Sequence, residues 1–262
     1  MTSPFIRNRQ RRLAIAAGEK IATRKPAAPD EKSESGQEYA ALKVRLHDNL
    51  RQLQDTESHE ARKPLKAQFA KAFEDWVDGI LIADKPVQDE IVLTCMIWAI
   101  DTGDYDRAVE IGEFAMKHGL DMPERYKRSV ACFLREDIAE LELANPGTVD
   151  LDLLSRIKSI TGEADMPDAA KAKLHKAIGR AWRAKADAFD AADDSAPAGG
   201  EAAYIAEALA QLKRALQLDK KAGVKKDIEQ LERRARDLGA PADDADQDTS
   251  PPFEPDNKGS GE

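Results

Sequence analysis

At positions 91–100 the chain reads Ile91-Val-Leu-Thr-Cys-Met-Ile-Trp-Ala-Ile100, and Asp101-Thr-Gly-Asp-Tyr105 follows directly. A segment that is apolar on nearly all sides indicates a helix buried at the centre of a protein. Pro86 precedes it, where the first turn of a helix tolerates proline. Asp104 can cap the next helix, for which Gly119 would be the C-terminal stop. Because the apolar run is about half of the ~20 residues needed to cross a bilayer, no membrane span is predicted.

Apolar residues on both sides of this segment recur at the three- and four-residue spacing of helices. The stripes are Tyr39, Leu42, Leu46, Leu50 and Leu53; Leu65, Phe69, Phe73, Trp76 and Ile80; and Leu151, Leu154, Ile157 and Ile160. Pro123 and Pro167 are each expected to open a further helix, and Gly162 to close the helix before Pro167. No run alternates apolar and polar β-branched residues, so the sequence predicts an all-α protein.

A repeated pattern refines this prediction. Ala108-Val109-x5-Ala115-Met116 and Ala208-Leu209-x5-Ala215-Leu216 have the same spacing, each after a preceding helix and a break. Small residues seven apart let a second helix approach the first closely, as in tetratricopeptide (TPR)-type helix pairs. We therefore expect an irregular helical bundle or solenoid of TPR-like helix pairs. An irregular bundle without TPR character stays open as the alternative.

The composition fits packed helices with charged outer faces. Hydrophobic residues make up 42% of the 262 positions and charged residues 34%, whereas aromatic residues reach only 5%, which excludes a β-sandwich and a chain disordered throughout. Cys95 and Cys132 each lie in an apolar stretch and are expected to be buried, reduced thiols. The N-terminus lacks the apolar core of a secretory signal. The expected location is the cytoplasm.

The two ends of the chain carry opposite charge, although the whole chain has a net charge of −9. Residues 1–30 have a balance of +5, and residues 239–262 a balance of −6. The acidic end holds too little apolar surface to offset the entropy of ordering and is predicted to be disordered. The expected parts are a basic N-terminal arm (1–30), a polar linker (25–38), a helical domain with the first TPR-like hairpin (39–189), a break (190–200), a C-terminal helical hairpin (201–238) and an acidic tail (239–262).

Motifs for catalysis are sparse. The chain has no Gly-Lys dipeptide and therefore no P-loop, and His59-Glu60 lacks the second histidine of a zinc-binding helix. The nearest candidates for a metal-dependent nuclease are Glu163, Asp165 and Asp168, with His175 and Lys176 downstream. These acids more simply indicate the start of a helix, where negative charge is favourable. No metal site or cofactor is predicted for this chain.

The basic arm carries a better functional signal, because arginines can meet phosphates with bidentate geometry. The candidate DNA-binding residues are Arg7, Arg9, Arg11, Arg12, Lys20, Arg24 and Lys25. Phe5, Ile6, Leu13 and Ile15 give the arm enough apolar surface for a helix that orders on binding. A solvated basic tail, or a docking arm for an acidic protein, remains open. A second basic run over residues 213–234 is interleaved with acids, which is typical of a salt-bridged solvent face.

Several motifs, in order along the chain, resemble the small terminase subunits of P2-like tailed bacteriophages. They are Trp76-Val77-Asp78-Gly79; Met96-Ile97-Trp98 with Asp101-Thr102-Gly103-Asp104; Ala115-Met116-Lys117-His118-Gly119-Leu120 with Met122-Pro123; Ala164-Asp165-Met166-Pro167-Asp168; Lys173-Leu174-His175-Lys176; and Leu218-Asp219 with Ala222-Gly223-Val224-Lys225-Lys226. The opening Met1-Thr2-Ser3-Pro4 is similar as well. The resemblance covers the arm and roughly residues 60–238.

The resemblance implies a subunit that binds double-stranded viral DNA at its cohesive-end site in the host cytoplasm and assembles as a homo-oligomer. It also implies a partner, the terminase large subunit, which carries the ATPase and with which Mg²⁺ and ATP are expected. Such proteins are conventionally described as the endonuclease subunit of terminase, but the residues here display no nuclease centre, so cleavage is expected from the holoenzyme. The acidic tail departs from the family's basic C-terminus, so the basic arm is favoured over the tail as the part that contacts DNA. A TPR-like protein-binding scaffold without DNA contact is the alternative.

Overall fold

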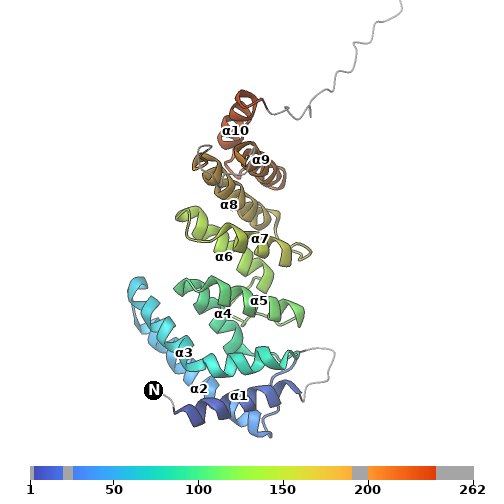
Figure 1. Cartoon of the computed structure of the whole chain (residues 1–262). Coiled ribbons are helices and arrows are strands. Elements are labelled where there is room, and N and C mark those ends of the chain that lie inside the picture. The colour runs from blue at the N-terminus through green and yellow to red at the C-terminus, as the bar shows by residue number, and fades with distance from the viewer. Residues whose placement is uncertain (1–2, 20–25, 191–199, 240–262) are drawn as a thin grey trace, which may run out of the picture.

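The computed structural model describes residues 3–19, 26–190 and 200–239, which form an all-α protein (Figure 1). These ranges contain no β-strand, only one isolated backbone bridge between Ala27 and Val87. The helices are α1 (Pro4–Glu19), α2 (Glu34–Asp55), α3 (His59–Ala83), α4 (Glu90–Thr102), α5 (Tyr105–Lys117), α6 (Val130–Ala144), α7 (Leu151–Ile160), α8 (Asp168–Asp187), α9 (Gly200–Leu218) and α10 (Lys225–Asp237). The predicted fold class is confirmed.

The helices stack in chain order into an elongated array, with α1–α3 at one end and α9–α10 at the other (Figure 1). One apolar core runs from α1 to α8, and a smaller one joins α8, α9 and α10. Trp182 of α8 packs against both cores. The array is therefore continuous, and its two ends present separate surfaces.

The alanines that suggested TPR-like pairs lie at the contacts between paired helices. Ala108 and Ala115 of α5 are completely buried in the core that α5 shares with α4, and Ala208 and Ala215 of α9 are equally buried next to α8. At the second contact a Cβ atom on Gly179 would lie 2.7 Å from Leu212 Cγ, so α8 and α9 approach as closely as glycine allows. The packing of small residues confirms the expectation of close helix pairs.

The apolar segment of residues 91–100 is buried at every position within α4. Asp104 caps α5, and Gly119 follows that helix with a left-handed φ of 63°, as expected. Two predicted helix starts are wrong, however. Pro86 lies outside α4, whose cap is Asp89, and Pro123 lies in a turn that ends before α6. In both cases a later side chain that can accept backbone hydrogen bonds sets the start, which for α6 is Ser129.

A buried polar cluster joins α2, α3 and α4. Asp89 is completely buried, and its carboxylate accepts hydrogen bonds from the backbone of Ile91 and Val92 and, at 2.8 Å, from Trp76 Nε1. Tyr39 stacks on the ring of Trp76 with centroids 5.9 Å apart, and its hydroxyl accepts from the backbone N–H of Glu90. The cluster therefore fixes the start of the central helix against two neighbours.

The N-terminal segment is not an arm separate from the helical domain. Ala14 and Ala17 of α1 are buried in the main core, where α1 packs along α3. A Cβ atom on Gly79 of α3 would lie 2.5 Å from Ala14 Cβ, so only glycine permits this contact. Small apolar residues that follow the arginines thus dock α1 on the protein, and the expectation of a segment that orders only on binding is corrected.

The predicted linker is also part of the packed structure where it is described. The backbone carbonyl of Ala27 accepts a hydrogen bond from the backbone N–H of Gln88 at 3.1 Å, Pro29 is buried, and α2 already begins at Glu34. Residues 20–25, most of the predicted break (191–199) and the acidic tail from residue 240 lie outside the described residues. The predicted disorder of the tail therefore stays a prediction. None of the described helices is both long and apolar enough to span a membrane.

Replacing Asp89 with Asn should change how stability depends on pH. Burial raises the pKa of Asp89 from its ordinary 3.8 to about 6. The folded state then holds this proton more tightly than the unfolded chain, so the unfolding free energy should fall as pH rises from about 4 to about 6. A shift of two units corresponds to about 3 kcal/mol. Denaturant titrations across this pH range should show the fall in wild type relative to Asp89→Asn; parallel profiles would contradict the account.

Gly79→Ala should loosen α1 from α3. The added methyl group would lie 2.6 Å from the backbone oxygen of Arg11, which a side-chain rotation cannot relieve. Amide hydrogen exchange in residues 4–17 should accelerate by about tenfold or more, because this helix then opens locally. Gly162→Ala is the control, since its Cβ would meet its nearest atoms at an ordinary 3.4 Å. Unchanged exchange in α1 of Gly79→Ala would show that the close contact is dispensable.

Candidate nucleic-acid interface

A groove between α1, α2 and α3 gathers positive charge from all three helices. It encloses about 1390 Å³. We call it the basic groove and define it by Arg7, Arg11, Arg45, Asn49 and Lys71, together with an acidic edge made of Glu74, Asp75 and Asp78. Arg7, Arg45 and Lys71 are exposed, and none of them pairs with a carboxylate among the described residues. Three cations without ion-pair partners, one from each helix, thus face one concave surface, together with Glu74 and Asp75, which also make no ion pair among the described residues.

The groove exists because α1 docks on α3. Asp78 of α3 accepts a hydrogen bond from Arg11 Nη2 of α1 at 2.7 Å and pairs on its other oxygen with Arg107 of α5. Arg107 also pairs with Glu110 at 2.6 Å. Asp78 therefore links three helices and anchors one wall of the groove. Its charge is matched by two arginines, so it does not cancel the free cations nearby.

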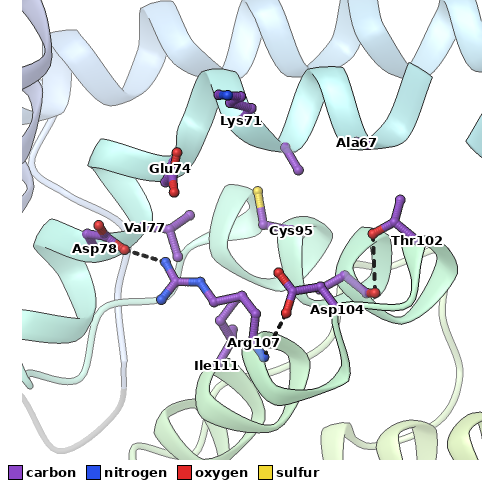
Figure 2. A pocket seen from close by; sticks show the side chains of 12 residues that line it. Ala67, Lys71, Glu74, Val77, Asp78, Cys95, Thr102, Asp104, Arg107 and Ile111 are labelled. Carbon is purple, nitrogen blue, oxygen red and sulfur yellow. Dashed lines mark hydrogen bonds and ion pairs between the residues drawn. The ribbon is translucent and has the colours of Figure 1, made fainter. Parts of the chain in front are cut away.

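A second, smaller pocket of about 590 Å³ lies between α3, α4 and α5 and shares Asp78 with the basic groove (Figure 2). Lys71, Glu74 and Asp78 line both hollows. Burial lowers the pKa of Arg107, but its hydrogen bonds to Glu110 and Asp78 outweigh this cost and raise its pKa overall. The guanidinium is thus a permanent cation that holds α5 to α3.

Both cysteines are buried and free, as the sequence predicts. Cys95 lines the smaller pocket, and burial raises the pKa of its thiol far above the ordinary value. Burial also raises the pKa of Cys132. Since a protonated thiol is a poor nucleophile, neither cysteine is a candidate for covalent chemistry.

The predicted arm residues differ in how free their charges are. Arg9 pairs with Glu34 at 3.3 Å and with Glu38 at 3.7 Å, both on α2, and Arg11 pairs with Asp78. Arg7 and Arg12 are exposed and pair with no described carboxylate. Lys20, Arg24 and Lys25 lie outside the described residues. The paired arginines hold the helix in place, while Arg7 and Arg12 keep charge available for a ligand.

Sequence reasoning missed Arg45, Asn49 and Lys71. Each lies on the polar side of a predicted helix, and no local pattern says that α1 will lie beside that side. Asn49 adds a signal of its own, because its Nδ2 donor is buried without a hydrogen-bond partner in the described part of the chain. Buried donors are almost always satisfied, so this unpaired donor on a residue that lines the groove is a second feature that points to the same place.

The weak nuclease candidates do not converge. Glu163, Asp165 and Asp168 are all exposed around the start of α8, where Pro167 is the N-cap residue as predicted. Farther along α8, His175 Nδ1 lies 2.8 Å from Gln211 Oε1 of α9, and Lys176 Nζ donates to the carbonyl of Ala222. Across the described ranges, no group of three or more His, Cys, Asp or Glu side chains could hold a metal ion. A bound Mg²⁺ therefore does not fit these residues.

The second basic run is salt-bridged only in part. Lys213 pairs with Glu232 at 3.1 Å, and Arg234 pairs with Glu201 at 2.7 Å and with Asp187. Lys220, Lys221, Lys225 and Lys226 are exposed and pair with no described carboxylate. The prediction of a neutralised face is therefore confirmed for Lys213 and Arg234 and wrong for the four lysines in the turn between α9 and α10 and in the first turn of α10.

Comparisons with known proteins agree on one family. The family model described as phage small terminase subunit matches residues 43–169. The "Terminase, endonuclease subunit" of Escherichia phage P2 is 37% identical over 201 residues, which cover 76% of this chain and 74% of that protein. The "Probable terminase, endonuclease subunit" of Haemophilus phage HP1 (strain HP1c1) is 25% identical over 224 residues, or 82% of this chain and 76% of that protein.

No solved structure matches the chain. The identity to the phage P2 protein extends over most of both chains, and the matched family region includes the central helix α4 and the Asp78–Arg107 pair. The chain therefore belongs to the phage small terminase subunit family.

Proposed function

We propose that this chain is the DNA-recognition subunit of a phage terminase and that it binds double-stranded viral DNA through the basic groove. Its DNA target would be the cohesive-end site, and its place of action the cytoplasm of the bacterial host. It would act as a homo-oligomer and deliver DNA to a terminase large subunit for cleavage and packaging. Family membership supports the terminase role, and the groove supports the DNA contact.

The observation that carries the proposal is the meeting of Arg7, Arg45 and Lys71 around one groove without carboxylate partners among the described residues. Free guanidinium and ammonium groups on rigid helices fit the phosphate backbone, which supplies most of the affinity of protein–DNA contacts. The donor of Asn49 would add a hydrogen bond to a phosphate oxygen after a side-chain rotation that opens it to the groove. Arg12, on the outer side of α1, extends the contact.

Nucleotide and metal chemistry belongs to the partner in this proposal. The chain has no P-loop sequence, and the carboxylates of its described part do not gather into a metal site. ATP and Mg²⁺ would act with the large subunit, and the word endonuclease in the relatives' names would describe the assembled terminase. The alternative is a protein-binding scaffold without DNA contact, and the DNA-binding experiments below distinguish the two functions.

Replacing Arg7, Arg45 and Lys71 together with Gln should weaken DNA binding and its dependence on salt. Each phosphate contact contributes about −0.9 to the slope of log affinity against log salt, so three lost contacts should reduce the slope by about 2 to 3. Fluorescence anisotropy with a labelled duplex at ~50 to ~200 mM salt measures this. These side chains are exposed, so circular dichroism should be unchanged.

The matched control removes three charges from exposed lysines elsewhere, Lys63, Lys85 and Lys127, none of which pairs with a described carboxylate. It should change the slope by less than 1. Equal slopes for the groove and control variants would exclude the groove as the DNA site. Absence of DNA binding by the wild type at both salt concentrations would favour the scaffold alternative.

The purified chain alone should leave supercoiled plasmid intact, with or without Mg²⁺. The exposed acids Glu163, Asp165 and Asp168 do not come together as a metal site in the described part of the chain, so we expect no metal-assisted cleavage from them. A nicking assay on highly purified protein measures this, and the same assay with the large subunit and ATP is the positive control. Cleavage that disappears on Asp165→Ala or Asp168→Ala would contradict the proposal.

A further inference from the structure

The turn between α9 and α10 concentrates unneutralised positive charge at the end of the array opposite the basic groove (Figure 1). Lys220, Lys221, Lys225 and Lys226 lie within seven residues, and all four are exposed. We call these four residues the lysine turn. Like charges packed this closely repel each other, which is unfavourable unless an anion neutralises them.

Asp219 and Asp227, two of the acids near the lysine turn, are already engaged, whereas the exposed Glu229 makes no ion pair among the described residues. The carboxylate of Asp219 accepts a hydrogen bond from the backbone N–H of Lys221 at 2.8 Å. Asp227 lies between two arginines of α8, at 3.0 Å from Arg180 and 2.8 Å from Arg183. On the neighbouring helices Lys213 and Arg234 pair with carboxylates, while no described carboxylate pairs with the four lysines. The positive charge of the lysine turn is therefore not neutralised by ion pairs within the described part of the chain.

The turn is held in one conformation. Val224 is completely buried in the C-terminal core, and Gly223 has a left-handed φ of 72° that an L side chain would resist. Lys176 Nζ of α8 donates to the backbone carbonyl of Ala222 at 2.8 Å and adds a fifth positive charge beneath the turn. The lysines are therefore carried on a fixed frame, which lowers the entropic cost of binding a partner.

The position of the lysines also opposes local helix stability. Lys225 and Lys226 are in the first turn of α10, where the positive end of the helix dipole disfavours cations, and the N-cap Val224 makes no side-chain cap. Local rules for helices favour Asp, Ser or Thr at such a start. Residues that break such local rules without a gain in stability are expected mainly at functional surfaces, and the start of α10 has two of them, Lys225 and Lys226.

We propose that the lysine turn is a second DNA-contacting surface, which binds backbone phosphates of the duplex held by the basic groove. This inference rests on the proposed function. Lysines make point-charge contacts that tolerate many phosphate positions, which suits a surface that reads no sequence. Because the two surfaces lie at opposite ends of the array, one subunit would contact DNA at two separate places (Figure 1).

The test neutralises the turn and measures the salt dependence of DNA binding. The variant Lys220→Gln, Lys221→Gln, Lys225→Gln and Lys226→Gln should lower the slope of log affinity against log salt by about 3 to 4. From ~50 to ~200 mM salt, wild type should therefore lose on the order of 100-fold more affinity than the variant. A four-lysine control, with Gln at exposed positions Lys32, Lys63, Lys85 and Lys127, should resemble wild type.

A footprint on the unmodified chain avoids any effect of substitution on folding. Acetylation of lysines, read by mass spectrometry, should slow at the lysine turn by about fivefold or more when duplex DNA is added, as binding occludes the amines. The same DNA should leave Lys32, Lys63, Lys85 and Lys127 reactive. Full reactivity of the turn under saturating DNA would overturn the inference.

The outcomes separate this inference from the proposed function. If wild type binds DNA and the groove variant loses that binding, but the lysine-turn variant matches its control, the second surface is rejected and the proposed function stands. If wild type binds no DNA, the proposed function itself fails. If the lysine-turn variant binds DNA more tightly than wild type, the turn acts through another partner, such as the acidic tail, and the inference is rejected.

Discussion

The contact between α1 and α3 determines how the N-terminal half of the protein presents its charge. Ala14 and Gly79 allow two helix backbones to approach more closely than any larger pair would permit. Arg11 then reaches Asp78, and Asp78 also holds Arg107 of α5. An arginine-rich segment that could have remained in solvent is thereby fixed as one wall of a groove.

The rest of the array depends on a second set of buried contacts. Asp89 caps the central helix and binds the indole of Trp76, which stacks on Tyr39. These contacts place α2, α3 and α4 together, and hence place Arg45 and Lys71 on either side of the groove. Salt bridges on the surface contribute little stability individually, so their value here is to fix orientation and to decide which cations stay free.

Much of the fold could be predicted from the sequence, because helical periodicity is a local property. The stripe from Tyr39 to Leu53, the buried segment 91–100 and the alanine pairs of α5 and α9 all identify helices and their inner faces. Helix starts were less predictable, since Pro86 and Pro123 are permissive signals, whereas the caps Asp89 and Ser129 make the hydrogen bonds that start α4 and α6.

The candidate site was only half predictable. Arg7 and Arg11 were identified from the density of basic residues, but their partners Arg45, Asn49 and Lys71 come from helices whose position beside α1 is a tertiary fact. The docking of α1 was missed because two alanines that follow a run of arginines give a weak apolar signal. Ala14 and Ala17 have too little apolar surface to form a clear stripe in the sequence, but their small size permits the close contact with α3.

The central claim is that the groove between α1, α2 and α3 is where DNA binds. Amide hydrogen exchange of the full chain, with and without a saturating duplex, tests it most directly. The account predicts slower exchange on DNA binding in residues 4–12, 43–50 and 67–76, which surround the groove. Slower exchange confined to α5–α8, with these three segments unchanged, would contradict it.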